Sequence, residues 1–145
     1  MQLLDSSLVQ LDVTVDSWQS AIRCAAEPLV KNKFVTKEYP ERVIEIAEKD
    51  GPYIVIAPHI ALSHAAVSDG DLKNGLGLTV LTEPVKFGNK VNDPVSLVFT
   101  LSSVGDDIHL SQMAALVNVL QKTRVIEKVT RSNDVNEVID LFNER

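Results

Sequence analysis

Residues 51–65 read Gly51-Pro-Tyr-Ile-Val-Ile-Ala-Pro-His-Ile-Ala-Leu-Ser-His-Ala65. The run from Tyr53 to Ala57 is apolar and rich in β-branched residues, which is typical of a strand buried on both faces. Irregular chain is expected after this strand, as far as Asp69-Gly70. The sequence therefore predicts that His59 and His64 share a loop at the end of a buried strand, where a rigid sheet commonly positions reactive groups.

Helix and strand patterns on both sides of this stretch predict a layered domain. The expected elements are an extended segment at 8–15, helices capped by Asp16 and by Thr36, strands at 53–57, 76–81 and 94–102, a helix capped by Asp106 or Asp107, a helix at 125–130, and a last helix opened by Asp134. The predicted inner faces are Trp18, Ala21, Ile22, Ala25 and Leu29; Val43, Ile46 and Ala47; Leu110, Met113, Ala114, Val117 and Leu120; and Val138, Leu141 and Phe142. The expected fold class is α/β, a small mixed sheet of about four to five strands with helices on both faces.

The length and the charge of the chain limit what it can do. Its 145 residues suit one domain, so residues 1–145 are expected to form a single unit. Hydrophobic residues make up 45% and charged residues 23%, as in ordinary globular proteins. The net charge of −6 and the lack of a basic run argue against nucleic acid as a partner, because phosphate backbones attract clustered Lys and Arg.

Export and membrane signals are not expected in this sequence. The first residues have neither the basic flank nor the apolar core of a signal peptide, and the apolar stretches are shorter than a membrane span. Cys24 is the only cysteine, which excludes an intramolecular disulfide and a thiolate metal cluster. A single free thiol without an export signal predicts a cytoplasmic protein.

The histidines are the strongest candidates for chemistry. The sequence contains no nucleotide-binding loop, dinucleotide fingerprint, Gly-x-Ser-x-Gly motif or His-Glu-x-x-His motif, so no cofactor is expected. The three histidines are His59, His64 and His109, and the last begins a predicted helix. A neutral imidazole has a nitrogen lone pair that can attack phosphorus without a separate base. A helix start offers free amides to a phosphoryl group.

Each histidine also has a purely structural interpretation. His64 can bridge backbone groups in its loop, His109 can be an ordinary first-turn residue, and His59, after Pro58, can shape the loop. A zinc site of His59, His64, His109 and an aspartate is a further alternative. The spacing of His59 and His64 is not a recognised ligand spacing, however, so no metal is expected.

Residues 51–65 resemble the active-site segment of enzyme IIA domains of the mannitol/fructose class, from the bacterial phosphoenolpyruvate-dependent sugar phosphotransferase system. Aligning Ile60-Ala-Leu-Ser-His-Ala65 with the family pattern places the phosphorylated histidine at His64 rather than His59. Val104-Gly-Asp-Asp-Ile-His-Leu110 is similar to the context of the second active-site histidine, so the resemblance implies that His109 stabilises the phosphoryl group. The wording of residues 51–58 is most similar to the branch serving L-ascorbate.

The resemblance implies a phosphotransferase component that works through a phosphohistidine. His64 would accept the phosphoryl group from the phosphocarrier protein HPr and pass it to a cognate enzyme IIB for sugar uptake. No metal, nucleotide or membrane insertion is implied, and a homodimer stays open. The alternatives are a regulatory enzyme IIA-like module that senses phosphorylation state and controls a protein partner, and a small zinc hydrolase. The sugar itself is not readable, because an enzyme IIA does not touch it.

Two positions depart from the family pattern. Ser63 stands where the family usually has proline, which would fix φ near −65° and stiffen the chain. The serine adds a hydroxyl that can bond a phosphoryl oxygen, so Ser63 and His59 are carried as supporting residues. Mannitol-type members also have an arginine in the second helix near the phosphoryl group. Arg42 lies too early in the sequence for that role.

Overall fold

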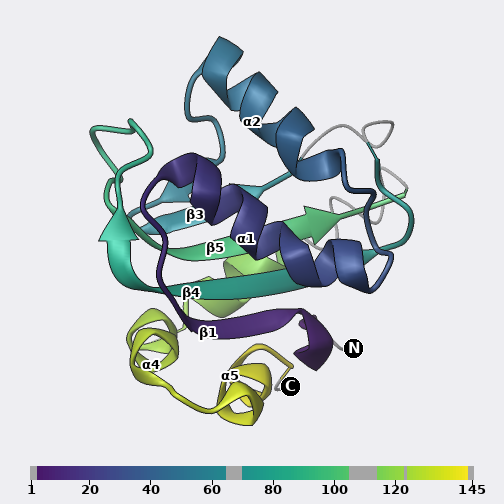
Figure 1. The fold of residues 1–145 in the computed structure, drawn as a ribbon. Helices are drawn as coiled ribbons and strands as arrows, with labels where there is room; N and C mark the ends of the chain where they lie inside the picture. Colours follow the sequence, from purple (N-terminus) through teal and green to yellow (C-terminus); the bar gives the residue numbers. More distant parts are fainter. Residues whose placement is uncertain (1–2, 65–69, 105–113, 123, 144–145) are drawn as a thin grey trace.

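A five-stranded sheet forms the centre of the protein in the computed structural model, which describes residues 3–64, 70–104, 114–122 and 124–143 (Figure 1). The strands are β1 (Val9–Val13), β2 (Val55–Ala57), β3 (Ile60–Ser63), β4 (Gly75–Val85) and β5 (Val95–Ser102), in the spatial order β1-β4-β5-β3-β2. Pairing is parallel for β1 with β4 and for β3 with β5, and antiparallel for β4 with β5 and for β2 with β3. The predicted mixed sheet is confirmed.

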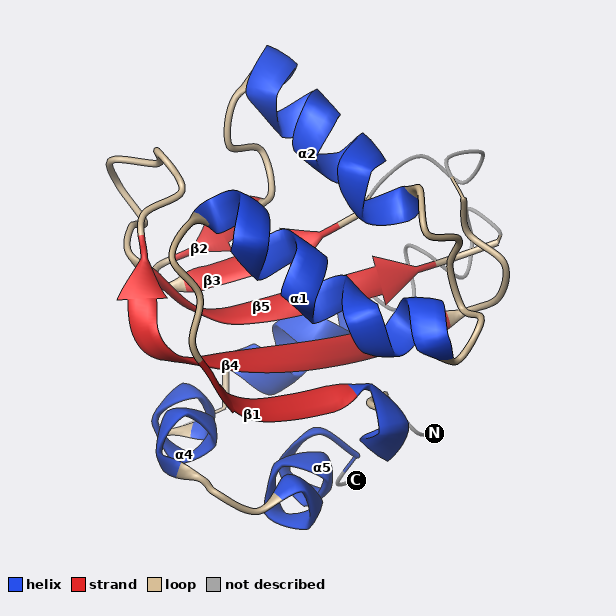
Figure 2. Cartoon of the chain, in the orientation of Figure 1, coloured by secondary structure: helices blue, strands red, loops and turns tan. Residues whose placement is uncertain are grey.

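Helices cover both faces of this sheet (Figure 2). On one face lie α1 (Trp18–Lys31) and α2 (Tyr39–Asp50); on the other lie helical residues 114–120, α4 (Val125–Arg131) and α5 (Val135–Asn143). The short helix η1 (Ser6–Leu8) precedes β1. Side chains alternate along β3, since Ile60 and Leu62 join one apolar cluster and Ala61 joins the other. The predicted three-layer α/β class is confirmed. No helix in the described ranges is both long and apolar enough to cross a membrane.

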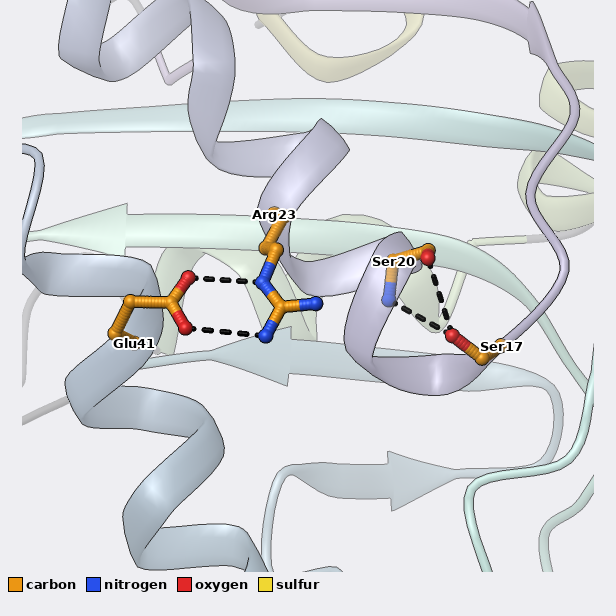
Figure 3. A network of polar contacts seen from close by, with 4 residues as sticks. All are labelled: Ser17, Ser20, Arg23 and Glu41. Atoms are coloured by element: carbon orange, nitrogen blue, oxygen red, sulfur yellow. Dashed lines mark hydrogen bonds and ion pairs between the residues drawn. The ribbon is translucent and has the colours of Figure 1, made fainter.

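The first two helices begin one or more residues later than the sequence patterns indicated. Ser17 caps α1 because its hydroxyl accepts the Ser20 amide at 3.1 Å (Figure 3). The Asp16 carboxylate accepts the Ser20 hydroxyl instead. The predicted Asp16 cap is therefore wrong by one position. The predicted Thr36 cap is also wrong. Helix α2 begins at Tyr39 with Pro40 in its first turn, and Thr36 supplies only a backbone carbonyl to the Tyr39 amide.

An ion pair joins α1 to α2 on the surface. Arg23 donates to both carboxylate oxygens of Glu41, at 2.8 and 3.1 Å (Figure 3). The hydrogen bond from Arg23 lowers the pKa of Glu41, and the same bond raises the pKa of Arg23. Both side chains are about half exposed, so water screens the pair and it adds little to stability.

In two helices the residues that face the core lie one or two positions away from the predicted ones. In α2 the buried isoleucine is Ile44, while Ile46, the one predicted to face inward, is only partly buried. In helical residues 114–120 the core is filled by Leu116 and Val119, while Ala114 and Val117 are exposed. A shift of one residue turns a helix face by about 100°, so a small error in register exchanges inside for outside. Leu110 and Met113 lie outside the described residues, as do Asp106 and Asp107.

The strand predicted at 53–57 is wrong in both extent and burial. Only Val55–Ala57 pairs, as edge strand β2, and Ile56 is 37% exposed. Pro52 and Pro58 lack amide donors and confine the pairing between them. The fully buried strand is β3, in the stretch predicted to be irregular, because it lies between β5 and β2.

A buried tyrosine ties α2 to the ends of two strands. The Tyr39 side chain is fully buried, and its hydroxyl donates to the carbonyl of Leu101 at 2.6 Å and to that of Ser63 at 3.2 Å. Burial raises the pKa of Tyr39 well above its ordinary value, so the hydroxyl keeps its proton and stays a donor. By contrast, the buried hydroxyls of Ser63 and Thr100, two residues paired in the β3–β5 register, have no hydrogen-bond partner.

Removing the Tyr39 hydroxyl should destabilise the fold. We expect Tyr39→Phe to lower the free energy of unfolding by about 2 kcal/mol, because two buried carbonyls lose a donor. Thr100→Val is the matched control, because it removes a buried hydroxyl without a partner, and it should leave stability unchanged or raise it by about 1 kcal/mol. Urea unfolding followed by Trp18 fluorescence measures both. Equal losses in the two variants would contradict the importance of the Tyr39 bonds.

Candidate active site

The candidate site lies where β3 and β5 end. The two strands run parallel with Ser63 paired to Thr100, so their carboxyl ends meet at one edge of the sheet (Figure 2). His64 is the first residue after β3. In open α/β sheets this edge is the usual place for a reactive group, since the strands hold it and the loops leave it accessible. His64 therefore follows a buried strand, as the sequence predicted, but that strand is β3. The prediction that His59 and His64 share one loop is wrong, because β3 lies between them.

The ring of His64 is oriented by its own backbone. Nδ1 lies 2.8 Å from the carbonyl oxygen of Leu62, and the side chain is half-buried. A carbonyl oxygen only accepts hydrogen bonds, so Nδ1 must carry the proton in this contact. In the neutral ring the lone pair then belongs to Nε2. The geometry therefore leaves Nε2 as the ring nitrogen with a free electron pair in neutral His64.

Tyr53 is the aromatic neighbour of His64. Its hydroxyl donates to the carbonyl oxygen of His64 at 2.7 Å. The two rings meet edge to face, with centroids 5.1 Å apart and planes at 80°. Tyr53 thus contacts both the backbone and the ring of His64. Neither Tyr53 nor Tyr39 was among the residues predicted for the site, because each acts on backbone carbonyls, which leave no motif in a sequence.

The exit of β5 is anchored beside the exit of β3. The Ser103 amide donates to the carboxylate of Asp71 at 3.0 Å, and the Val104 amide donates to the side-chain oxygen of Asn74 at 2.9 Å. The chain then continues toward His109, which lies outside the described residues. The role predicted for His109, to stabilise a phosphoryl group, stays a prediction.

His59 lies at the other end of β3. The four extended residues of β3 separate His59 from His64 by roughly 3.3 Å per residue, so the two rings lie at opposite ends of the strand and do not share a zinc ion or a phosphoryl group. His59 has φ +69°, and its Nδ1 lies 2.8 Å from the Pro94 carbonyl. Its backbone carbonyl accepts the amides of Ser96 and Leu97. His59 shapes the loop before β3, and the predicted support for His64 does not fit this geometry.

Ser63 and Arg42 are the two remaining residues considered for the site. Ser63 is fully buried within β3 and its hydroxyl has no hydrogen-bond partner, so its bond to a phosphoryl oxygen stays a prediction. Arg42 pairs with Glu45 at 2.8 Å on the exposed side of α2. Among the described residues, no group of three His, Cys, Asp or Glu side chains is arranged to hold a metal ion.

Solved structures similar to this one include IIA proteins of the sugar phosphotransferase system. The mannitol-specific cryptic phosphotransferase enzyme IIA of Escherichia coli matches with a TM-score of 0.88 and 26% identity, covering 100% of both chains. A chain of the complex of mannitol enzyme IIA with phosphorylated mannitol enzyme IIB, also from Escherichia coli, matches with a TM-score of 0.85 and 28% identity, covering 98% of both chains. The fold and the histidine at its strand ends thus define a phosphotransferase-system IIA domain.

The chain belongs to the family described as phosphoenolpyruvate-dependent sugar phosphotransferase system, EIIA 2, whose sequence profile matches residues 2–145. The ascorbate-specific EIIA component of Escherichia coli is 28% identical over 141 residues, which cover 97% of this chain and 92% of the relative. The predicted family resemblance is confirmed. Membership gives the chain a phosphotransferase role in sugar transport.

The tautomer of His64 can be observed directly. In solution at about pH 8.5, where imidazole is neutral, we expect His64 to carry its proton on Nδ1. Two-bond ¹H–¹⁵N correlation spectra of the ring measure the tautomer, and His64→Ala assigns the signals. His59 is the internal reference, because its Nδ1 also faces a carbonyl oxygen. A predominant Nε2–H form at His64 would contradict the geometry.

Proposed function

We propose that His64 is the phosphorylated residue of a phosphoryl relay. In this proposal Nε2 of His64 accepts a phosphoryl group from phosphorylated HPr and passes it to a cognate enzyme IIB, in the uptake of a sugar of the L-ascorbate type. The observation that carries the proposal is the hydrogen bond between Nδ1 and the Leu62 carbonyl, which leaves the lone pair on Nε2. The sugar class rests on the ascorbate-specific relatives.

The chemistry needs no separate base or metal. The Nε2 lone pair attacks phosphorus, a nitrogen–phosphorus bond forms, and the bond to the donor histidine of HPr breaks, with its electron pair returning to that ring. The His64 ring gains positive charge as the bond forms. The Nδ1 proton, donated to the Leu62 carbonyl, spreads that charge into a stronger, charge-assisted hydrogen bond. Transfer to enzyme IIB reverses these events, with a side chain of the partner as the nucleophile.

Several finer assignments belong to the same proposal. His109 assists by stabilising the phosphoryl group from a helix start, as the family resemblance implies. Residues 1–145 act as one enzyme IIA domain, in keeping with the family match over 2–145. The relay operates in the cytoplasm, where the free thiol of Cys24 stays reduced. No step requires a second copy of the chain, so a homodimer is not assigned.

Exposed apolar side chains around the strand ends support protein donors and acceptors. Tyr53, Leu72 and Val104 are 36%, 53% and 45% exposed. The Asp71 carboxylate accepts the Ser103 amide, which holds these two residues together. Leu72 and Val104 are the next residues in each segment, so they lie near each other at this edge of the sheet. Apolar side chains on a protein surface near a reactive group favour docking of another protein.

Phosphorylation in vitro tests the proposal. Incubation with phosphoenolpyruvate, enzyme I and HPr should add one acid-labile phosphate per chain, and His64→Ala should add none. His59→Ala is the matched control and should be labelled like the parent, because His59 lies at the opposite end of β3. Labelling of His64→Ala to the parent level would refute His64 as the acceptor.

The transfer to enzyme IIB separates a carrier from a sensor. When the isolated phosphorylated chain is mixed with the cognate enzyme IIB, its labelled phosphate should move to enzyme IIB. A chain that retains its phosphate with every enzyme IIB supplied would instead be the regulatory module that the sequence left open.

A further inference from the structure

Three successive carbonyls at the end of β3 accept hydrogen bonds from aromatic side chains. Leu62 accepts from Nδ1 of His64 at 2.8 Å, Ser63 from Tyr39 at 3.2 Å, and His64 from Tyr53 at 2.7 Å. The chain here leaves the β3–β5 ladder, whose last pair is Ser63 with Thr100. These side chains thus hold the backbone at the point where strand pairing stops.

The direction of the reactive nitrogen depends on this short piece of backbone. The His64 ring bonds to a carbonyl only two residues earlier, so a rotation of the peptide between them would turn the ring away. The hydroxyl of Tyr53 restrains the peptide that follows His64, and its ring restrains the imidazole plane at 80°. Tyr53 therefore contacts both the backbone and the imidazole ring of His64, and these two together set the direction of Nε2.

The departure at Ser63 makes this restraint more important. A proline at that position would fix φ before the histidine by covalent geometry, and a serine does not. The Ser63 hydroxyl has no hydrogen-bond partner, so it adds no restraint of its own. The hydrogen bond from Tyr53 restrains the other side of His64 instead.

We propose that Tyr53 is a positioning residue for phosphoryl transfer at His64. Its hydroxyl and ring hold the backbone and the imidazole so that Nε2 faces the incoming phosphorus. The proposal rests on the proposed function, because it assumes that His64 is the phosphorylated residue. Tyr53 itself forms no bond to the phosphoryl group. Because transfer needs aligned reacting atoms, a small loss of orientation lowers the rate of the chemical step rather than the binding of the donor.

Tyr53 differs from Tyr39 in what its loss would do. Tyr39 is fully buried, and removing its hydroxyl disturbs the core. Tyr53 is 36% exposed, so water can replace its hydroxyl at the surface and the fold should tolerate the change. A defect in Tyr53→Phe therefore reports on the orientation of His64 rather than on the stability of the sheet.

Single-turnover transfer from phosphorylated HPr tests this role. At saturating donor, Tyr53→Phe should transfer about tenfold more slowly than the parent, while the donor concentration for half-maximal rate stays within about twofold. The final amount of acid-labile phosphate per chain should be unchanged. Val91→Ala is the control for an exposed apolar change, because Val91 is 87% exposed in the loop at the opposite end of β5, and it should match the parent.

The tautomer of His64 supplies a readout that a change in stability would not move. In folded Tyr53→Phe, the ring spectrum at about pH 8.5 should show a smaller Nδ1–H population at His64 and an unchanged spectrum at His59. A rate within about twofold of the parent, or an unchanged His64 tautomer, would overturn the role of Tyr53. Labelling of His64→Ala at the parent level would instead refute the proposed function, and with it this inference.

Discussion

Parallel pairing of β3 with β5 brings two strand ends, far apart in the sequence, to one edge of the sheet. The register from Ile60 with Leu97 to Ser63 with Thr100 fixes how far each strand reaches, and so where His64 leaves the sheet. Tyr39 bridges the two ends by donating to a carbonyl of each strand. A shift of one residue in this register would turn the side chains of β3 to the opposite face and move His64 relative to the end of β5.

The proposed phosphoryl transfer depends on orientation more than on acid–base strength. A neutral imidazole is already a nucleophile toward phosphorus, so the protein has only to choose the nitrogen and aim it. The bond to the Leu62 carbonyl determines which ring nitrogen of His64 keeps its lone pair, and Tyr53 restrains the direction of that nitrogen. Ser63, which stands where the family usually has proline, is buried in β3, and its backbone carbonyl accepts from Tyr39.

The sequence predicted the parts of the fold that depend on long periodic patterns, and it failed where pairing partners decide. Strand β5 and helix α1 follow from their own apolar patterns. Strand β3 has only four residues, and its burial comes from neighbours on both sides, so no local pattern revealed it. The apolar run at 53–57 appeared central because periodicity cannot tell an edge strand from an inner one. His64 was found by the family resemblance, while Tyr53 and Tyr39 were missed because their bonds go to backbone atoms.

The position of the phosphoryl group on the imidazole ring is the most direct test of whether Nε2 of His64 is the phosphorylated atom. After phosphorylation by enzyme I and HPr, ³¹P and ¹⁵N NMR of the intact chain identifies the phosphorylated nitrogen. We expect a phosphoramidate on Nε2 of His64, with the Nδ1 proton still donated to the Leu62 carbonyl. A phosphoryl group on Nδ1 of His64, or on His59 or His109, would contradict it.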